Sequence, residues 1–398
     1  MRLILQTLII LLLPFSIGFQ NLTIQSGHTF RSYKENGVQI CENSGGPRYT
    51  ADPFRYEHLI TFRGDPRDEE TLLYSPVDLS VDGAGNYYIC DQGNHRIAVF
   101  DDAGRYTRSF GREGAGPGET LSMALQSIQG SHISIFDDRL QRTCIFHTDG
   151  SLIEVIRIFE GGQIQGLQRV HNGHLLVTGF KWRMIDSITH ETRSLTQLTS
   201  DGSDTLWIIE SDPVEVYANM PVGSGSDRGS NLFSRMPFSA RPVSVYSPDH
   251  GILLTDGISP VIRRFDLTGQ MIQEIRLGLP FRKVTGAMKQ RMKNRFMGRQ
   301  IDWFFPEYIG FWHGIYVDDS GYIWLEAIPE NGIPESPTDS VMHVVSPNGE
   351  YLGVTEMPAE VRRIRRGLLL GAWYEIENRD YVPVAYRIHA TVEGLIYP

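Results

Sequence analysis

The strongest constraint on the fold of this chain is a unit of about 40 residues that recurs along it. Its clearest copy, residues 72–119, contains four short runs rich in Val, Ile, Tyr and Phe, separated by tight turns of Gly and Asp. Such a pattern predicts four antiparallel strands in a meander. The predicted strands cover residues 77–81, 86–90, 96–100 and 105–110.

Weaker copies of the unit begin near residues 121, 166, 241, 312 and 360. Six units of four strands predict an all-β protein, a six-bladed β-propeller of four-stranded antiparallel blades. A lone strand, HLITFR at residues 58–63, is expected to close the ring onto the last blade, because an open seam would leave two blade faces exposed to solvent. A β-sandwich or two small barrels would not show this period.

The chain divides into three segments before any residue-level chemistry is considered. Residues 1–20 combine Arg2 with an apolar run at 3–13 and predict a signal peptide, with an uncleaved N-terminal anchor as the alternative. Residues 21–56 are predicted to be irregular, and residues 57–398 form the propeller. No other stretch is long enough to cross a membrane. We therefore expect an exported protein that is periplasmic, cell-surface or secreted.

Composition limits the function classes. The formal net charge of −10 argues against nucleic acid as a partner, since that binding needs a basic surface. Forty glycines and 21 prolines fit a turn-rich β protein. The spacing of Cys41, Cys90 and Cys144 matches no metal or disulfide framework, so these residues are expected in the core. We expect a monomer.

Two kinds of segment carry a family resemblance. DGAGNYYICDQGNHRIAVFDDAGRYTRSFG, residues 82–111, resembles an NHL-type repeat. GREGAGPGE at 111–119, VDDSGYIWL at 317–325 and LGAWYEIENRDYVPVAYRI at 370–388 resemble a family of exported bacterial six-bladed β-propeller proteins. The resemblance implies the fold and export, and it implies no particular activity.

The lengths of the connections predict which face of the propeller carries the binding site. Turns between first and second strands, and between third and fourth strands, fall on one face and are short, as in DGAG, DDAG and DLTG. We call this the plain face. The long insertions, residues 211–240, 278–311 and 327–340, all fall on the opposite, elaborated face. Because binding residues concentrate on long loops, we expect a ligand or protein partner there, although neutral drift of surface loops is the alternative.

One helix is predicted, at residues 284–299 between the fourth and fifth blades. Met288, Met292 and Phe296 form an apolar stripe, and the remaining positions are rich in Lys and Arg. A basic amphipathic helix can lie on a membrane or a partner. We expect it instead to pack on the domain and to cover the mouth of the central channel.

Polar residues near the starts of the innermost strands are candidates for the site. The motif GREGAGPGE lacks the Gly-Lys-Ser/Thr ending of a phosphate loop and is therefore expected to be a link between blades. The loop Asp91–Arg96 is expected to hold the second and third strands of its blade together. No metal or cofactor is predicted, and a metal-assisted lyase or hydrolase, lactonase-like or amidating-lyase-like, is the alternative to a binding module. The expected ligand-binding residues are Asp78, His95, Arg96, Arg112, Gln126, Gln168, Arg241, Trp312 and His313.

Overall fold

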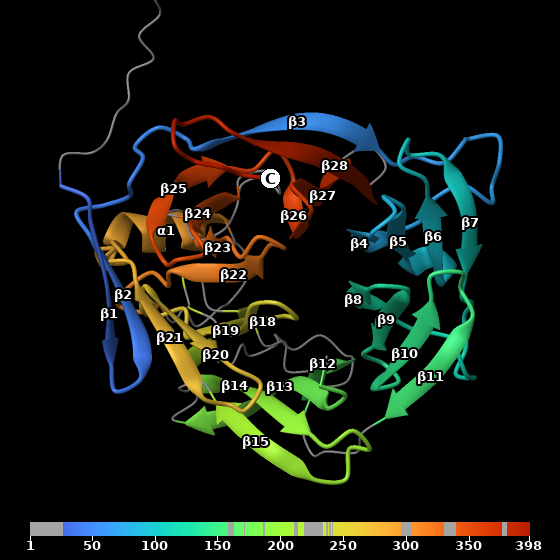
Figure 1. Ribbon diagram of the computed structural model, residues 1–398, viewed down its shortest axis with the longest axis horizontal. Coiled ribbons are helices and arrows are strands. Elements are labelled where there is room, and N and C mark those ends of the chain that lie inside the picture. Colours follow the sequence, from blue (N-terminus) through green and yellow to red (C-terminus); the bar gives the residue numbers. More distant parts are fainter. Residues whose placement is uncertain are drawn as a thin grey trace, which may run out of the picture.

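Six antiparallel sheets surround a central axis in the computed structural model of the protein, which confirms the predicted propeller (Figure 1). The structure describes residues 27–157, 163–170, 172–185, 188–210, 214–218, 234–235, 238, 240, 242–295, 305–329, 340–375 and 380–398. The predicted signal peptide at residues 1–20 lies outside these residues.

Each blade runs outward from an innermost strand beside the axis. Blade 1 contains β4 (Pro76–Val81), β5 (Tyr87–Asp91), β6 (Arg96–Phe100) and β7 (Tyr106–Phe110). Blade 2 contains β8 (Ala124–Gln129), β9 (His132–Asp137), β10 (Arg142–His147) and β11 (Leu152–Arg157). Blade 3 contains β12 (Gln163–Arg169), β13 (Leu175–Ile185), β14 (Ile188–Leu198) and β15 (Thr205–Glu210).

The second half of the ring repeats this order. Blade 4 contains β18 (Val243–Ser247), β19 (Gly251–Thr255), β20 (Val261–Phe265) and β21 (Met271–Arg276). Blade 5 contains β22 (Trp312–Val317), β23 (Ile323–Ala327), β24 (Val341–Val345) and β25 (Tyr351–Glu356). Blade 6 contains β26 (Glu360–Arg365), β27 (Leu368–Glu375), β28 (Asp380–Ala390) and β3 (Phe54–Thr61).

The ring closes through β3, which comes from the N-terminal part of the chain. It pairs antiparallel with β28, from Phe54 opposite Ala390 to Thr61 opposite Val384. The predicted closing strand is therefore confirmed, although it begins four residues earlier than expected. Phe54 is buried and packs against Trp324 and Tyr397, so the closure also joins blade 6 to blade 5 and the C-terminal tail.

The tight turns of the plain face owe their shape to aspartate. The Asp82 carboxylate accepts hydrogen bonds from the backbone N–H groups of Ala84 and Asn86. Asp101, Asp266 and Asp318 accept in the same way from residues two and four positions further on. A carboxylate that holds its own turn explains why the repeated Asp-x-x-Gly segments predicted hairpins correctly.

The prediction that residues 21–56 are irregular is wrong for one part of that segment. Strands β1 (Thr29–Glu35) and β2 (Val38–Ser44) form a hairpin, and β2 pairs parallel with β21 at the outer edge of blade 4. Asn43 accepts a hydrogen bond from the backbone N–H of Tyr351 and donates to the carbonyl of Gly349. A side chain at Gly349, where φ is +92°, would approach the Cys41 sulfur to 2.7 Å. The hairpin thus seals the outer seam between blades 4 and 5.

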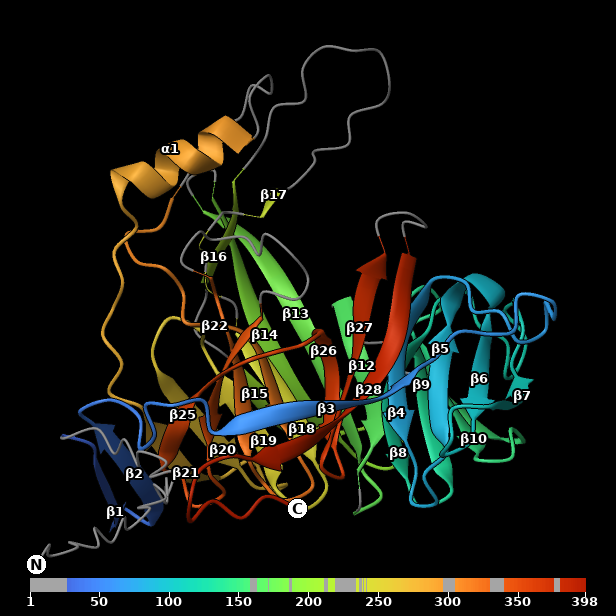
Figure 2. The same cartoon turned by 90° about the horizontal axis from the view of Figure 1, so that it is seen from above.

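The elaborated face carries the additional elements. Helix α1 (Gly286–Arg295) and the short strands β16 (Val214–Ala218) and β17 (Ser234–Arg235) project from the same side of the disc (Figure 2). Strand β16 pairs with the far half of β14, which extends blade 3 beyond the disc. Most of the predicted insertions at 211–240 and 327–340 lie outside the described residues.

Helix α1 packs on the domain, as expected, through Met292. This side chain is buried with Phe238, Val284, Ile309 and Ile328, while Phe296 of the predicted stripe lies outside the described residues. In the view along the axis, α1 lies toward the rim, between blades 4 and 5 (Figure 1). The expected cover over the channel mouth is therefore not formed by this helix.

The core consists of layers between neighbouring blades. One layer joins blades 5 and 6 around Trp324 and Leu369, and another joins blades 1 and 2 around Ile97 and Ile133. The three cysteines are buried and unbridged, which confirms their interpretation as core residues. Among the described residues, no helix is both long and apolar enough to cross a membrane.

Candidate ligand site in the central channel

The innermost strands share an irregularity near their starts. In blades 1, 2, 3, 5 and 6, the pairing between the first and second strands shifts by one residue, whereas the pairing of β18 with β19 is regular. Each shift is a β-bulge, which leaves one residue without a ladder partner and re-aims the neighbouring side chains. The bulged residues, all on the elaborated side of the disc, are Val77, Gln126, Gln165, His313 and Arg362.

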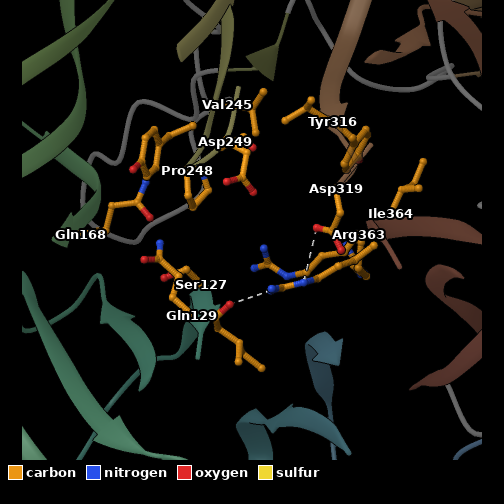
Figure 3. A pocket seen from close by; sticks show the side chains of 16 residues that line it. Ser127, Gln129, Gln168, Val245, Pro248, Asp249, Tyr316, Asp319, Arg363 and Ile364 are labelled. Carbon is orange, nitrogen blue, oxygen red and sulfur yellow. Dashed lines mark hydrogen bonds and ion pairs between the residues drawn. The ribbon is translucent and has the colours of Figure 1, made fainter. Parts of the chain in front are cut away.

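A polar pocket of about 160 Å³ lies further along the same strands, toward the plain face. It is formed by the innermost strands of blades 2 to 6 and by the turns that follow β18 and β22. Figure 3 shows its labelled side chains surrounding one space. The polar and charged lining residues are Ser127, Gln129, Gln168, Tyr246, Ser247, Asp249, Tyr316, Asp319, Arg362, Arg363 and Arg365.

Arg365 spans this space from blade 6 to blade 2. Its guanidinium donates to the backbone carbonyl of Ile128 at 2.7 Å, and its Nε lies 3.7 Å from Oδ1 of Asp319. Burial lowers the pKa of Arg365, with Arg363 and Arg366 acting in the same direction and Asp319 and Asp249 opposing them. Arg365 therefore lies among charges of both signs, with Asp319 in an ion pair with it.

The next layer toward the elaborated face contains an ion pair between blades 1 and 6. Asp78 accepts from Arg363 at 2.9 Å, and both side chains are largely buried. Burial raises the pKa of Asp78, and the Arg363 charge and hydrogen bond act against that rise. Removing one partner of such a pair would leave an uncompensated charge in a poorly solvated place.

A third group of polar residues lies in blade 5. His313 Nδ1 is 3.4 Å from Oε2 of Glu326, and Ser340 donates to Glu326 at 2.9 Å. Burial favours a raised pKa for Glu326, but His313 and the hydrogen-bonding neighbours lower it overall. The Tyr316 hydroxyl donates to the Val361 carbonyl at 3.2 Å, which ties this group to the innermost strand of blade 6.

The structure brings only part of the predicted site together. Gln168 lines the pocket, Asp78 is joined to it through Arg363, and His313 lies at the bulge of β22. Trp312 is 1% exposed and belongs to the core between blades 4 and 5, so it is not available to a ligand. The backbone of Gln126 lies in β8, whereas its side chain and the whole of Arg241 lie outside what the structure describes.

The remaining predicted residues serve other contacts. Arg96 pairs with buried Asp91 at 2.8 Å and donates to the carbonyls of Glu70 and Leu72, which confirms the expected strand lock. Arg112 pairs with Glu119 at 2.7 Å within the Gly-rich link. His95 lies 3.9 Å from Glu113, beside the same link. None of these three residues lines the pocket.

Sequence reasoning missed Gln129, Asp319 and Arg365. Arg365 belongs to the run VRRIRRG at residues 361–367, a signal that was visible, but only the fold shows that its side chain reaches blade 2. Among the described residues, no group of three or more His, Cys, Asp or Glu side chains is placed to hold one metal ion. The described residues of the pocket can therefore offer a ligand hydrogen bonds and ionic contacts.

Comparison with known proteins supports the fold. A family model described as a 6-bladed β-propeller, DUF5128, matches residues 68–158, which span blades 1 and 2. A crystal structure from Bacteroides fragilis, described as a "putative exported protein", is similar with a TM-score of 0.52 at 10% identity, covering 88% of this chain and 99% of that one. None of the curated proteins matches the chain by sequence.

Two further solved structures have lower TM-scores. A DUF4221 family member from Bacteroides vulgatus has a TM-score of 0.47 at 12% identity, covering 85% of this chain and 99% of that one. A streptogramin B lyase has a TM-score of 0.40 at 12% identity, covering 85% and 98%. At these identities the likeness concerns the fold, so function has to be argued from the site.

Proposed function

We propose that the protein is a binding protein that holds a small polar ligand in the pocket of its central channel. The observation that carries this proposal is the convergence of polar side chains from the innermost strands of five blades on one space. Ligand sites in proteins are concave and combine a few convergent polar groups with a rigid frame. Five strands of five separate blades provide such a frame.

The size of the pocket limits what it can hold. Its volume of about 160 Å³ is below the roughly 300–1,000 Å³ of pockets for drug-sized ligands. The ligand is therefore a small molecule, or one end of a larger molecule that extends out of the channel.

We also propose that the protein is exported and that the ligand, or a protein partner, is met on the elaborated face. The apolar run at residues 3–13 supports export. The projection of α1, β16 and β17 from one side of the disc supports the choice of face (Figure 2). The bulged residues Val77 and His313 are both exposed at that mouth of the channel, where a ligand could reach them.

Ligand-observed NMR with a library of small polar compounds tests the pocket. Ser127→Trp would fill the pocket from β8, and Ser151→Trp, at an exposed turn of the same blade, is the matched control. We expect compounds that bind the wild-type protein to bind Ser151→Trp and to be lost from Ser127→Trp. Equal binding to Ser127→Trp, with its fold verified by circular dichroism, would place the site elsewhere.

The route of entry has its own test. Val77→Trp adds bulk at the elaborated mouth, and Asp249→Trp adds bulk at the plain mouth. If the elaborated face is used, association of a bound compound slows in Val77→Trp and not in Asp249→Trp. Metal analysis of the purified full chain addresses the lyase or hydrolase alternative, because a stoichiometric ion would contradict a function limited to binding.

A further inference from the structure

The pocket contains hydrogen-bond donors that the described residues leave without acceptors. Gln129 Nε2, Arg362 Nε and Arg365 Nε are buried atoms that make no hydrogen bond among the described residues, and Arg365 Nε faces Oδ1 of Asp319 at 3.7 Å. No side-chain oxygen of the described lining residues is buried and unpaired in this way. Buried donors are normally satisfied, and leaving them unpaired is costly, so this surface is complementary to a group rich in acceptors.

Two of the donor residues are linked through one backbone contact. Arg365 donates to the carbonyl of Ile128, the residue that precedes Gln129 at the end of β8. Both residues line the pocket, Arg365 from β26 of blade 6 and Gln129 from β8 of blade 2. An acceptor group placed there could receive hydrogen bonds from both.

The charges are arranged from the inside outward. Arg365 is accompanied by Arg363, whose charge is paired with Asp78, and by Arg366, and the Arg365 side chain is 29% exposed. The acidic residues of the pocket, Asp249 and Asp319, lie in the turns of the plain face and are both exposed. Water weakens the field of an exposed carboxylate more than that of a partly buried guanidinium. The wall formed by β26 is thus cationic, and the plain-face side of the pocket is acidic.

We propose that the pocket binds the carboxylate of a small monocarboxylic acid, whose oxygens accept hydrogen bonds from Arg365 and Gln129. This inference rests on the proposed function and adds the chemical class of the ligand. A planar guanidinium suits a planar carboxylate, because two parallel N–H donors can meet its two oxygens. Asp249 and Asp319, in the plain-face turns that border the pocket, repel a second negative charge, which disfavours dicarboxylates and phosphate.

Titration calorimetry on the full chain, with four probes, tests the charge requirement. The probes are lactate, its uncharged amide lactamide, the dicarboxylate malate, and inorganic phosphate. We expect lactate to bind, lactamide and phosphate not to bind, and malate to bind more weakly than lactate.

Two variants assign the contact. Arg365→Gln removes the charge, and Gln129→Glu replaces a donor with an acceptor while leaving the Arg365 contact to Ile128 in place. Each should weaken lactate binding roughly tenfold or more, because hydrogen bonds to charged groups are stronger than neutral ones. Arg105→Gln, at an exposed ion pair of blade 1, is the matched control and should leave the affinity unchanged.

Each contrary result has a distinct meaning. Equal binding of lactamide and lactate in the channel would overturn the carboxylate inference and leave the proposed function standing. Tighter binding of malate or phosphate would overturn the choice of a monocarboxylate. Binding of other library compounds without any of the four probes would also overturn the inference, whereas a pocket that Ser127→Trp shows to bind nothing would overturn the proposed function itself.

Discussion

Breaking the buried ion pair between Asp91 and Arg96 should destabilise blade 1 far more than breaking an exposed pair. Asp91 is fully buried, and Arg96 is 14% exposed on its side chain, with 2.8 Å between Nε and Oδ2. Arg96 also donates to the carbonyls of Glu70 and Leu72, each at 2.6 Å. The residue therefore joins β6 to the segment that precedes β4 as well as to Asp91.

Replacing Arg96 with Ala would leave the Asp91 carboxylate buried without its cation. Breaking a buried pair by removing one partner costs about 3–5 kcal/mol. Asp91 keeps hydrogen bonds from the backbone N–H of Tyr74 and from Asn94, so the lower end of that range applies. We expect Arg96→Ala to lower the free energy of unfolding by about 3 kcal/mol.

The same blade offers a matched control. Arg105 pairs with Asp101 at 2.8 Å, but its side chain is 78% exposed, and pairs of this kind contribute about 0–1 kcal/mol. Urea unfolding followed by tryptophan fluorescence should therefore separate Arg96→Ala from Arg105→Ala by at least about 2 kcal/mol. Equal losses in the two variants would refute the argument from burial.

Two further predictions concern other buried polar contacts. The hydroxyl of Tyr397, in the C-terminal tail, donates to Oδ2 of Asp318 at 2.8 Å, so Tyr397→Phe should cost about 1–3 kcal/mol in urea unfolding, and an unchanged midpoint would contradict this anchoring role. Burial, with a smaller effect from Arg282, lowers the pKa of His343 to about 4. This histidine must gain a proton on unfolding below its ordinary pKa of about 6.5, so its contribution is complete above pH 6.5 and is lost as the pH falls toward 4. From pH 7 to pH 5 the loss should be about 2 kcal/mol, and His343→Gln should lose stability over that interval by about that much less than the wild type.

The fold was predictable because the turn residues and the repeat of about 40 residues indicate the same strands. The turns at Asp82, Asp101 and Asp318 form through hydrogen bonds within the turn itself, so a short stretch of sequence contains the whole cause. The strands predicted in blade 1 accordingly match β4 to β7 within one residue at either end.

The β1–β2 hairpin was missed for the opposite reason. The sequence TFRSYKE of β1 is mostly exposed, and strand β2 depends on pairing with β21, more than 200 residues further along the chain.

The pocket was only partly predictable for a similar reason. Asp78 and Gln168 were found from their place near strand starts, whereas Arg365 acts through a contact with blade 2 that no local pattern contains.

The bulges around the channel have a consequence for how this scaffold can change its specificity. A bulged residue such as Val77, Gln165 or Arg362 has no partner in the ladder between the first two strands, so its side chain can be exchanged without altering that pairing. The blades beneath remain held by their own cores. Related chains could therefore recognise different molecules at the elaborated mouth through single substitutions at the five bulged positions of the innermost strands. No insertion, deletion or movement of a blade would be needed.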